Sequence, residues 1–206
     1  MQPLAKLLQI LARNPQGPSP TFERAHLLLA FLTIGESGTI GRHLLAVRVG
    51  LGEGAVRTVL KRLREKGLAD ADASGCHLTR EGRGAYSSLI KKLSPPVAVE
   101  GSRLTMGAAQ VAVSVRGGGN AVKSGIEQRD SAIGVGAAGA TTYVMWSSRF
   151  TIPSGSDDCE RDFPSSAWAI LRRKLKPTNG DAIILCGSDT AETARIGALS
   201  AALSLL

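Results

Sequence analysis

The chain has 206 residues, with 25 Lys and Arg against 17 Asp and Glu and a formal net charge of +8. Hydrophobic residues make up 43% and charged residues 20%, which excludes wholesale disorder and suits one domain or two small ones. No apolar run approaches the roughly 20 residues that span a bilayer, and polar residues interrupt the apolar stretch a signal peptide needs. Cys76, Cys159 and Cys186 are too widely spaced for a zinc motif. We therefore expect a cytoplasmic protein with reduced thiols and with no membrane contact, metal or cofactor.

The positive charge is concentrated in the first half of the sequence. Residues 1–93 hold 14 Lys and Arg against 7 Asp and Glu, whereas residues 94–206 hold 11 against 10. Between the halves, Pro95 and Pro96 prevent a helix from continuing. This pattern predicts an N-terminal helix and linker over 1–20, a basic domain over 21–93, a linker over 94–100 and a near-neutral domain over 101–206.

Helical patterns dominate the basic half. Leucines at helical spacing in the first 11 residues indicate a short helix that either packs on its own domain or forms a dimer. A Pro-rich loop over 14–20 follows. Thr21 is the expected N-cap of a second helix, over Phe22–Ile34. Two further helices are predicted at about Ile40–Val49 and at Glu53–Lys66, before Gly67.

The helix over Glu53–Lys66 has the pattern of a DNA-recognition helix. Val56, Val59, Leu60 and Leu63 form one apolar stripe. Small, polar and basic residues occupy the rest, as a helix that enters the major groove requires. The candidate DNA contacts on this helix are Gly54, Ala55, Arg57, Thr58, Lys61 and Arg62.

A hairpin and a final helix complete the basic half. Residues 68–72 and 76–79 alternate as two strands around the turn Ala73-Ser74-Gly75, and a helix is predicted from Arg80 to about Leu93. His77 and Arg80 are the candidate DNA contacts in this part. Asp70 and Asp72 make the hairpin acidic, so we expect it to contribute little more to DNA binding.

Residues 58–68 (TVLKRLREKGL) and 78–83 (LTREGR) resemble the winged helix-turn-helix superfamily, in which a similar helix end and a similar exit from the wing occur together. The resemblance covers about residues 21–93 and implies a regulator that binds double-stranded DNA as a homodimer. Glu53 departs from the expected pattern, because it would repel phosphate at the start of the recognition helix. A winged helix used for protein–protein contacts is the alternative.

The second half predicts a small α/β sandwich, so that the whole chain is of the α+β class. Strands are expected at Gln110–Val115, Thr141–Trp146, Phe150–Ile152 and Asp181–Cys186. Helices are expected at about Ser124–Gly136, at about Pro164–Leu175, and from Ser188 to the C-terminus.

The sequence patterns that indicate ligand contacts in this half are weak. Gly118, Gly119 and Asn120 lie in a glycine-rich loop that resembles a damaged phosphate loop, because Val122 replaces a required glycine. Such a loop could still hold an anion with its amides, although a plain hairpin loop explains it as well. Further candidates are Glu127 and Arg129 in one polar turn, and Ser188 after a buried strand. All three histidines lie in the first half, so we expect no catalytic residue here.

The whole chain also resembles a family of two-domain archaeal proteins of unassigned function, through Asn14–Phe22 (NPQGPSPTF) and Gly125–Ile133 (GIEQRDSAI). The resemblance implies a regulator layout in which the second domain dimerises or senses a small-molecule effector. The alternative is a bifunctional protein whose second domain is a small-molecule enzyme with a regulatory winged helix.

Overall fold

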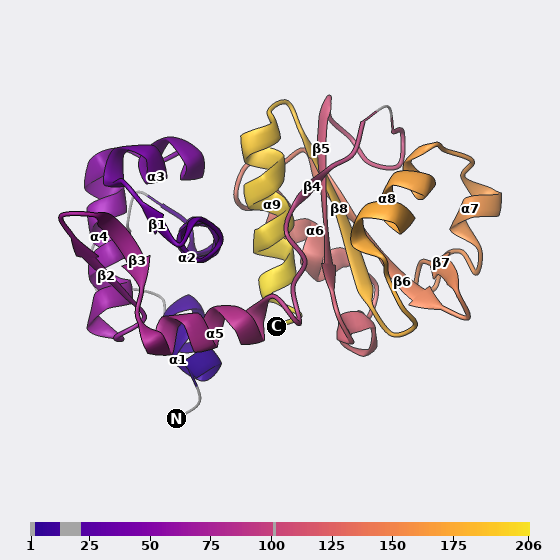
Figure 1. Ribbon diagram of the computed structural model, residues 1–206. Coiled ribbons are helices and arrows are strands. Elements are labelled where there is room, and N and C mark those ends of the chain that lie inside the picture. Colours follow the sequence, from indigo (N-terminus) through magenta and orange to yellow (C-terminus); the bar gives the residue numbers. More distant parts are fainter. Residues whose placement is uncertain (1–2, 13–21, 101) are drawn as a thin grey trace. The chain divides into compact units, whose positions relative to one another are not determined.

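The computed structural model describes residues 3–12, 22–100 and 102–206 and divides into two compact units, unit 1 (Met1–Ile90) and unit 2 (Lys91–Leu206) (Figure 1). The predicted Pro-rich loop over 14–20 and the expected cap Thr21 lie outside the described residues. Each unit has its own antiparallel sheet, so the protein is a mixed α+β structure.

Unit 1 contains the predicted helices and hairpin, in the predicted order. One strand that the sequence did not indicate, β1, joins the hairpin to give the order β1-β3-β2. The elements are α1 (Pro3–Ala12), α2 (Arg24–Ser37), β1 (Thr39–Ile40), α3 (Arg42–Val49), α4 (Glu53–Glu65), β2 (Ala69–Asp72), β3 (Gly75–Leu78) and α5 (Arg80–Leu89).

The helix ends of unit 1 have local causes. Helix α2 begins later than predicted, because Glu23 caps it: its backbone N–H donates to His26 Nδ1 at 3.1 Å. Gly50 ends α3 in the left-handed region, at φ +68°, which suits glycine. Helix α5 begins after Thr79, whose Oγ1 accepts from Gly82 N at 3.0 Å.

Helix α1 packs on its own unit. Leu7 and Leu11 are buried, and Lys6 Nζ lies 2.6 Å from Glu81 Oε1 on α5. Of the two roles expected for this helix, the structure supports packing within the domain.

Unit 2 is built on one five-stranded sheet in the order β4-β5-β8-β6-β7, with every neighbouring pair antiparallel. Its elements are β4 (Val97–Ala98), β5 (Ala109–Val115), the 3-10 helix η1 (Gly118–Ala121), α6 (Ile126–Ile133), β6 (Gly139–Trp146), β7 (Arg149–Thr151), α7 (Cys159–Asp162), α8 (Ala167–Leu175), β8 (Ala182–Ser188) and α9 (Ala191–Leu203).

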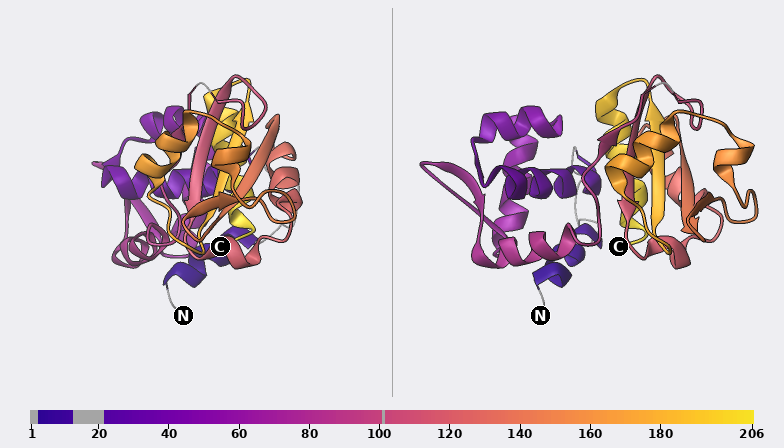
Figure 2. Two further views of the ribbon diagram at one scale, coloured as in Figure 1. Left: turned by 90° about the vertical axis from the view of Figure 1, so that its right-hand side faces the viewer. Right: turned by 45° about the vertical axis from the view of Figure 1, so that its right-hand side comes forward.

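Helices cover both faces of this sheet (Figure 2). Helices α6 and α9 pack against one face and against each other. On the other face, α8 buries Trp168, Leu171 and Leu175 against Tyr143 and Ile183 of the sheet. The central strand β8 is therefore buried along its whole length.

Three details of unit 2 differ from the sequence prediction. The segment expected as a linker over 94–100 is partly strand, because Val97 and Ala98 pair with β5. Strand β8 continues through Ser188, and Thr190 caps α9 by accepting from Thr193 N at 3.2 Å. Between the predicted strand at Phe150–Ile152 and the predicted helix from about Pro164, where no element was predicted, the structure contains the short helix α7. None of the described helices combines the length and apolar character needed to cross a bilayer.

Candidate nucleic-acid interface

Helix α4 has one buried side and one exposed side. Val56, Val59 and Leu63 are fully buried in the core of unit 1. Gly54, Arg57, Thr58 and Lys61 are exposed, and a Cβ at Gly54 would meet open space. The predicted apolar stripe is thus confirmed, and the opposite side of the helix is accessible.

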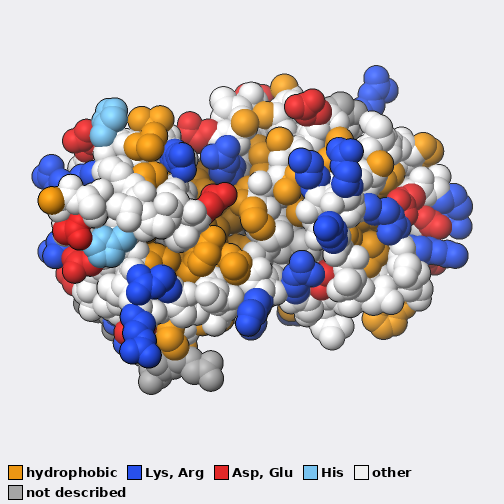
Figure 3. Space-filling model, viewed as in Figure 1, with side chains coloured by type: hydrophobic (Ala, Val, Ile, Leu, Met, Phe, Trp, Pro, Cys, Tyr) orange, Lys and Arg blue, Asp and Glu red, His pale blue; other side chains and the backbone are white. Residues whose placement is uncertain are grey.

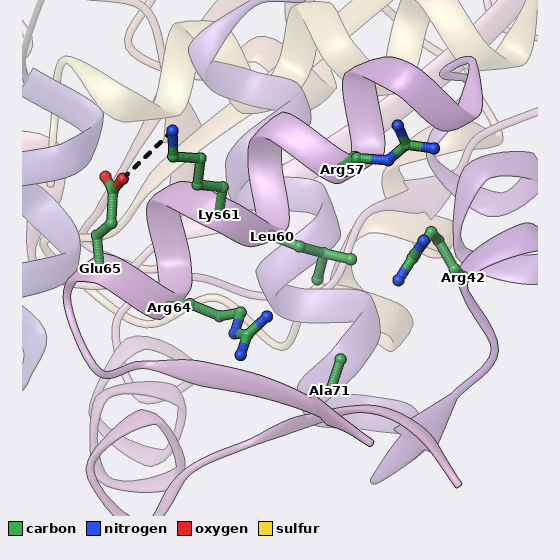
Figure 4. Close-up of a pocket in the computed structure, with 7 residues that line it drawn as sticks. All are labelled: Arg42, Arg57, Leu60, Lys61, Arg64, Glu65 and Ala71. Carbon is green, nitrogen blue, oxygen red and sulfur yellow. Dashed lines mark ion pairs between the residues drawn. The ribbon is translucent and has the colours of Figure 1, made fainter. Parts of the chain in front are cut away.

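Beside this exposed side lies an open hollow of about 290 Å³, bordered by α4, the start of α3 and β2. Four cations and one carboxylate line it. The lining residues are Arg42, Arg57, Leu60, Lys61, Arg64, Glu65 and Ala71. In Figure 4, Leu60, Arg64 and Ala71 face a space that Arg42 and Arg57 border on the side of α3, whereas Lys61 and Glu65 point toward each other. The hollow is therefore a concentration of positive charge with an apolar floor.

Two of the four cations have acidic partners. Arg64 Nε lies 3.1 Å from Asp70 Oδ1 on β2, and Lys61 Nζ lies 4.0 Å from Glu65 Oε1. Both pairs are exposed, and such pairs typically contribute about 0–1 kcal/mol, so a phosphate could replace the acidic partner at small cost. No ion pair is recorded for Arg42 or Arg57 within the part of the chain that the structure describes.

Other predicted DNA contacts have different surroundings. The Arg62 guanidinium lies 5.1 Å from the centroid of the Phe22 ring, and it is displaced from Arg57 around the helix axis. His77 is half-buried on β3, with Nδ1 3.8 Å from Asp72 Oδ2. Arg80 is exposed at the start of α5, and Ala55 is half-buried. The hollow thus brings together Arg57 and Lys61 but not Arg62, His77 or Arg80.

The sequence did not single out two lining cations, Arg42 and Arg64. Arg64 follows Arg57 by seven residues and so lies on the same side of α4. Helical periodicity could therefore have identified Arg64 from the sequence. Arg42 comes from another helix, and its place depends on how α3 packs against α4. No local pattern in the sequence indicates it.

Glu53, expected to repel phosphate, lies beside a histidine. Its Oε1 is 3.2 Å from His43 Nδ1. Thr58 Oγ1 donates to Gly54 O at 3.2 Å, which leaves the hydroxyl oxygen free to accept from a ligand.

The glycine loop of unit 2 is a packing element. Gly118 and Gly119 are buried in η1, and Gly119 N donates to Gly180 O at 2.8 Å. A Cβ at Gly119 would lie only 2.7 Å from that same oxygen. The Gly119 amide is therefore engaged within the protein, which contradicts the expectation that it could hold an anion.

The remaining ligand candidates of unit 2 do not converge. Val115, just before the glycine loop, pairs with Ala182, whereas Ser188 pairs with Ala109. Six residues of strand separate these ends of the sheet by about 20 Å. Ser188 is buried within β8 and does not follow it, and because β8 is antiparallel to both neighbours, it does not end at an edge where parallel strands place their carboxyl ends together. Asn120 is exposed.

Glu127 and Arg129 form surface pairs on α6. Glu127 Oε1 lies 4.0 Å from Lys123 Nζ, and Arg129 NH2 lies 3.0 Å from Asp130 Oδ1. Glu127 and Arg129 are both exposed, so this polar turn is part of a solvated surface that carries charges of both signs. On the face shown in Figure 3, Lys and Arg side chains are scattered over unit 2 as well as unit 1, and Asp and Glu lie among them near α7.

No activated nucleophile or metal cluster is found among the described residues. Burial raises the pKa of the Cys186 thiol to about 12 and also raises the pKa of Cys76 and Cys159. All three thiols are buried and protonated at neutral pH. Within the described ranges, no three His, Cys, Asp or Glu side chains gather as a metal site requires.

Comparisons with known proteins agree with the division into two units. Residues 106–205, which lie within unit 2, match a family model described as a domain of unknown function (DUF4443). The structure is similar to that of the hypothetical protein PH0730 from Pyrococcus horikoshii OT3, with a TM-score of 0.70 and 26% sequence identity. That similarity covers 88% of this chain and 91% of the other, so it extends over both units. No curated protein matches the chain.

Proposed function

We propose that the protein is a DNA-binding transcriptional regulator whose unit 1 is a winged helix that places α4 in the major groove of double-stranded DNA. The order of elements from α2 to α5 supports this, because a winged helix consists of a helix, a short strand, two further helices and a hairpin in that order, and here α5 follows the hairpin. An α-helix with its side chains is about 10–12 Å wide and fits a major groove about 12 Å wide.

The observation that carries the proposal is the basic hollow beside the exposed side of α4. Arg42 and Arg57 have no acidic partner recorded among the described residues, and Arg64 and Lys61 have only exposed ones. A DNA backbone supplies phosphates on both sides of a helix that lies in the groove. We infer that Arg42, Lys61 and Arg64 contact phosphates, while Gly54, Arg57 and Thr58 approach the bases.

The hairpin contributes less than the helix in this proposal. The side-chain hydroxyl of Ser74 donates to Asp72, and this hydrogen bond, together with that from the Ser74 backbone, lowers the pKa of the Asp72 carboxyl. Asp72 is thus ionised at neutral pH and repels phosphate. His77, the predicted DNA contact on the hairpin, lies beside this same carboxylate.

A homodimer is part of the proposal, because helix-turn-helix regulators commonly read two half-sites about 34–36 Å apart. A second copy of the chain would double the phosphate contacts, and the operator would then be palindromic. Sedimentation of the protein with and without an operator fragment measures this stoichiometry.

Fluorescence anisotropy with the full-length protein tests the proposal. We expect submicromolar binding to duplex promoter fragments at low salt and a steep loss of affinity as salt rises. Arg57→Ala and Thr58→Ala should change the preference among sequences. No binding below micromolar concentration at low salt would exclude the proposal.

The same titration and a thermal melt distinguish this proposal from its two alternatives. A winged helix used for protein–protein contacts gives no salt-dependent DNA affinity. A small-molecule enzyme in unit 2 predicts that a nucleotide with magnesium raises the melting temperature.

A further inference from the structure

Unit 2 contains an open pocket of about 370 Å³ on the face of the sheet that α8 covers. Among its lining residues, we call Thr141 and the buried Tyr143 of β6 the floor, the half-buried Leu104 and Ile152 the walls, and the exposed Arg103 and Phe163 the rim. The volume lies at the lower end of the roughly 300–1,000 Å³ typical of small-molecule sites.

The floor of the pocket is held rigidly. The Tyr143 ring is 2% exposed and stacks edge-on against Trp168, with centroids 5.1 Å apart. Thr141 Oγ1 donates to Leu104 O at 3.0 Å, which ties the floor to one wall. Leu104 and Ile152 pack against the core that contains Tyr143. These contacts hold the shape of the pocket, so a ligand needs little ordering of the protein to bind there.

The rim combines an uncovered aromatic ring with an unpaired cation. Phe163 is 49% exposed at the mouth of the pocket. Arg103 is the one charged residue that lines the pocket, and no ion pair is recorded for it within the described ranges.

The acids of the neighbouring α7 segment already have partners. Asp162 Oδ1 accepts from Arg161 Nε at 2.7 Å, and Glu160 Oε1 accepts from Arg172 Nε at 2.9 Å. They do not compete for Arg103, so the pocket offers an apolar chamber with a single positive group at its edge.

We propose that this pocket binds a small monocarboxylate with an aromatic or branched apolar body. The carboxylate pairs with the Arg103 guanidinium, whose planar donors match the two carboxylate oxygens. The apolar body lies on Thr141 and Tyr143 and covers the exposed ring of Phe163. A single cation suits one negative charge and leaves a dianion undercompensated.

Calorimetric titration of the full-length protein tests this ligand class without DNA, so its outcome does not depend on the proposed DNA binding. The probes are phenylacetate and 4-methylvalerate, each compared with its neutral amide. We expect the carboxylates to bind with dissociation constants of about 1 mM or below. The amides should bind roughly tenfold more weakly, because they cannot form the charged pair.

Two variants locate the charge that the carboxylate requires. R103Q should weaken carboxylate binding about tenfold and leave amide binding unchanged. The control R116Q removes another exposed arginine, directly after β5, and should change neither. Phe163→Ala should weaken carboxylates and amides alike, because it removes apolar contact without removing charge.

Amide chemical shifts of the wild-type protein provide an answer even if a variant fails to fold. Phenylacetate should shift Thr141, Ile152 and Ser165, which line the pocket, and leave unit 1 unchanged. Equal binding of carboxylate and amide, equal effects of R103Q and R116Q, or shifts confined to other residues would each overturn the proposal. So would the absence of carboxylate binding in the millimolar range.

Discussion

Replacing Lys61 by Ala tests the role of α4 most directly, because unit 2 offers a matched control. Lys61 Nζ lies 4.0 Å from Glu65 Oε1, and Lys123 Nζ lies 4.0 Å from Glu127 Oε1, both pairs four residues apart. The two lysine side chains are 76% and 84% exposed. Lys61→Ala and Lys123→Ala thus remove the same charge from ion pairs of the same spacing, length and similar exposure, and only the first is on α4.

The size of the expected effect follows from counterion release. One phosphate contact contributes about 0.9 to the slope of log affinity against log salt concentration. At about 0.1 M monovalent salt, losing that contact weakens binding about eightfold, evenly across sequences. Either exposed pair contributes about 0–1 kcal/mol to stability, so a difference in folding cannot explain a large difference in DNA affinity.

Anisotropy titrations at several salt concentrations measure both quantities. We expect Lys61→Ala to lower the salt slope by about one and Lys123→Ala to leave it unchanged. Equal slopes for Lys61→Ala and the unmodified protein would show that α4 does not face the DNA backbone at this position. Equal losses in both variants would show that binding senses only net charge.

Three further predictions concern packing and pH. Gly54→Ala should leave the protein as stable or more stable by about 0.5–1 kcal/mol, because the added Cβ meets open space, yet it should weaken DNA binding by keeping the helix from the bases. A urea melt measures the stability and a gel shift the DNA affinity. An unchanged DNA affinity would contradict the close approach of Gly54 to the bases. Gly119→Ala should lower the free energy of unfolding by about 1–3 kcal/mol, because the added Cβ would meet Gly180 O at 2.7 Å. Gly139→Ala should not, because no atom lies within 4 Å of the Cβ it adds. Similar urea midpoints for the two variants would count against the packing role of Gly119. Because burial raises the folded-state pKa of Cys186 to about 12, its stabilising effect is complete below about pH 9 and is lost as pH rises toward 12; Cys186→Ala should flatten that decline in chemical denaturation, and an unchanged slope would refute it.

The sequence predicts the helices of unit 1 well because their signals are local. The apolar stripe of α4 repeats every three to four residues, and Val56 and Leu63 are buried as that period requires. The two-residue strands β1 and β4 are too short to show any period, and they were missed. Their positions are set by the partners they pair with.

The direction and order of the strands in unit 2 are not local properties. The buried run of β8 is equally compatible with a parallel strand, because helices cover both faces of the sheet. Its antiparallel neighbours, β5 and β6, are fixed by pairing across tens of residues. Ser188, a candidate expected after the buried strand, is instead the last residue of β8.

The candidate site was predicted to the extent that it lies on one helix. Arg57 and Lys61 follow from helical geometry, whereas Arg42 enters the hollow only through the packing of α3 on α4. At the glycine loop, the sequence indicated a candidate site that the structure explains by packing. A sequence with the composition of an anion site serves close packing against Gly180 instead.

The central position of β8 has a consequence for how the protein is synthesised. Strands β5 and β6 both pair with β8 and not with each other, yet β8 is the last of the strands to leave the ribosome. While the nascent chain lacks it, both strands keep unpaired edges, and unit 2 waits for nearly its whole sequence before its sheet closes. Unit 1 ends at Ile90 and is free to fold long before that point. Translation thus completes the two units at well-separated times, and a nascent chain stalled before β8 exposes edges that chaperones recognise.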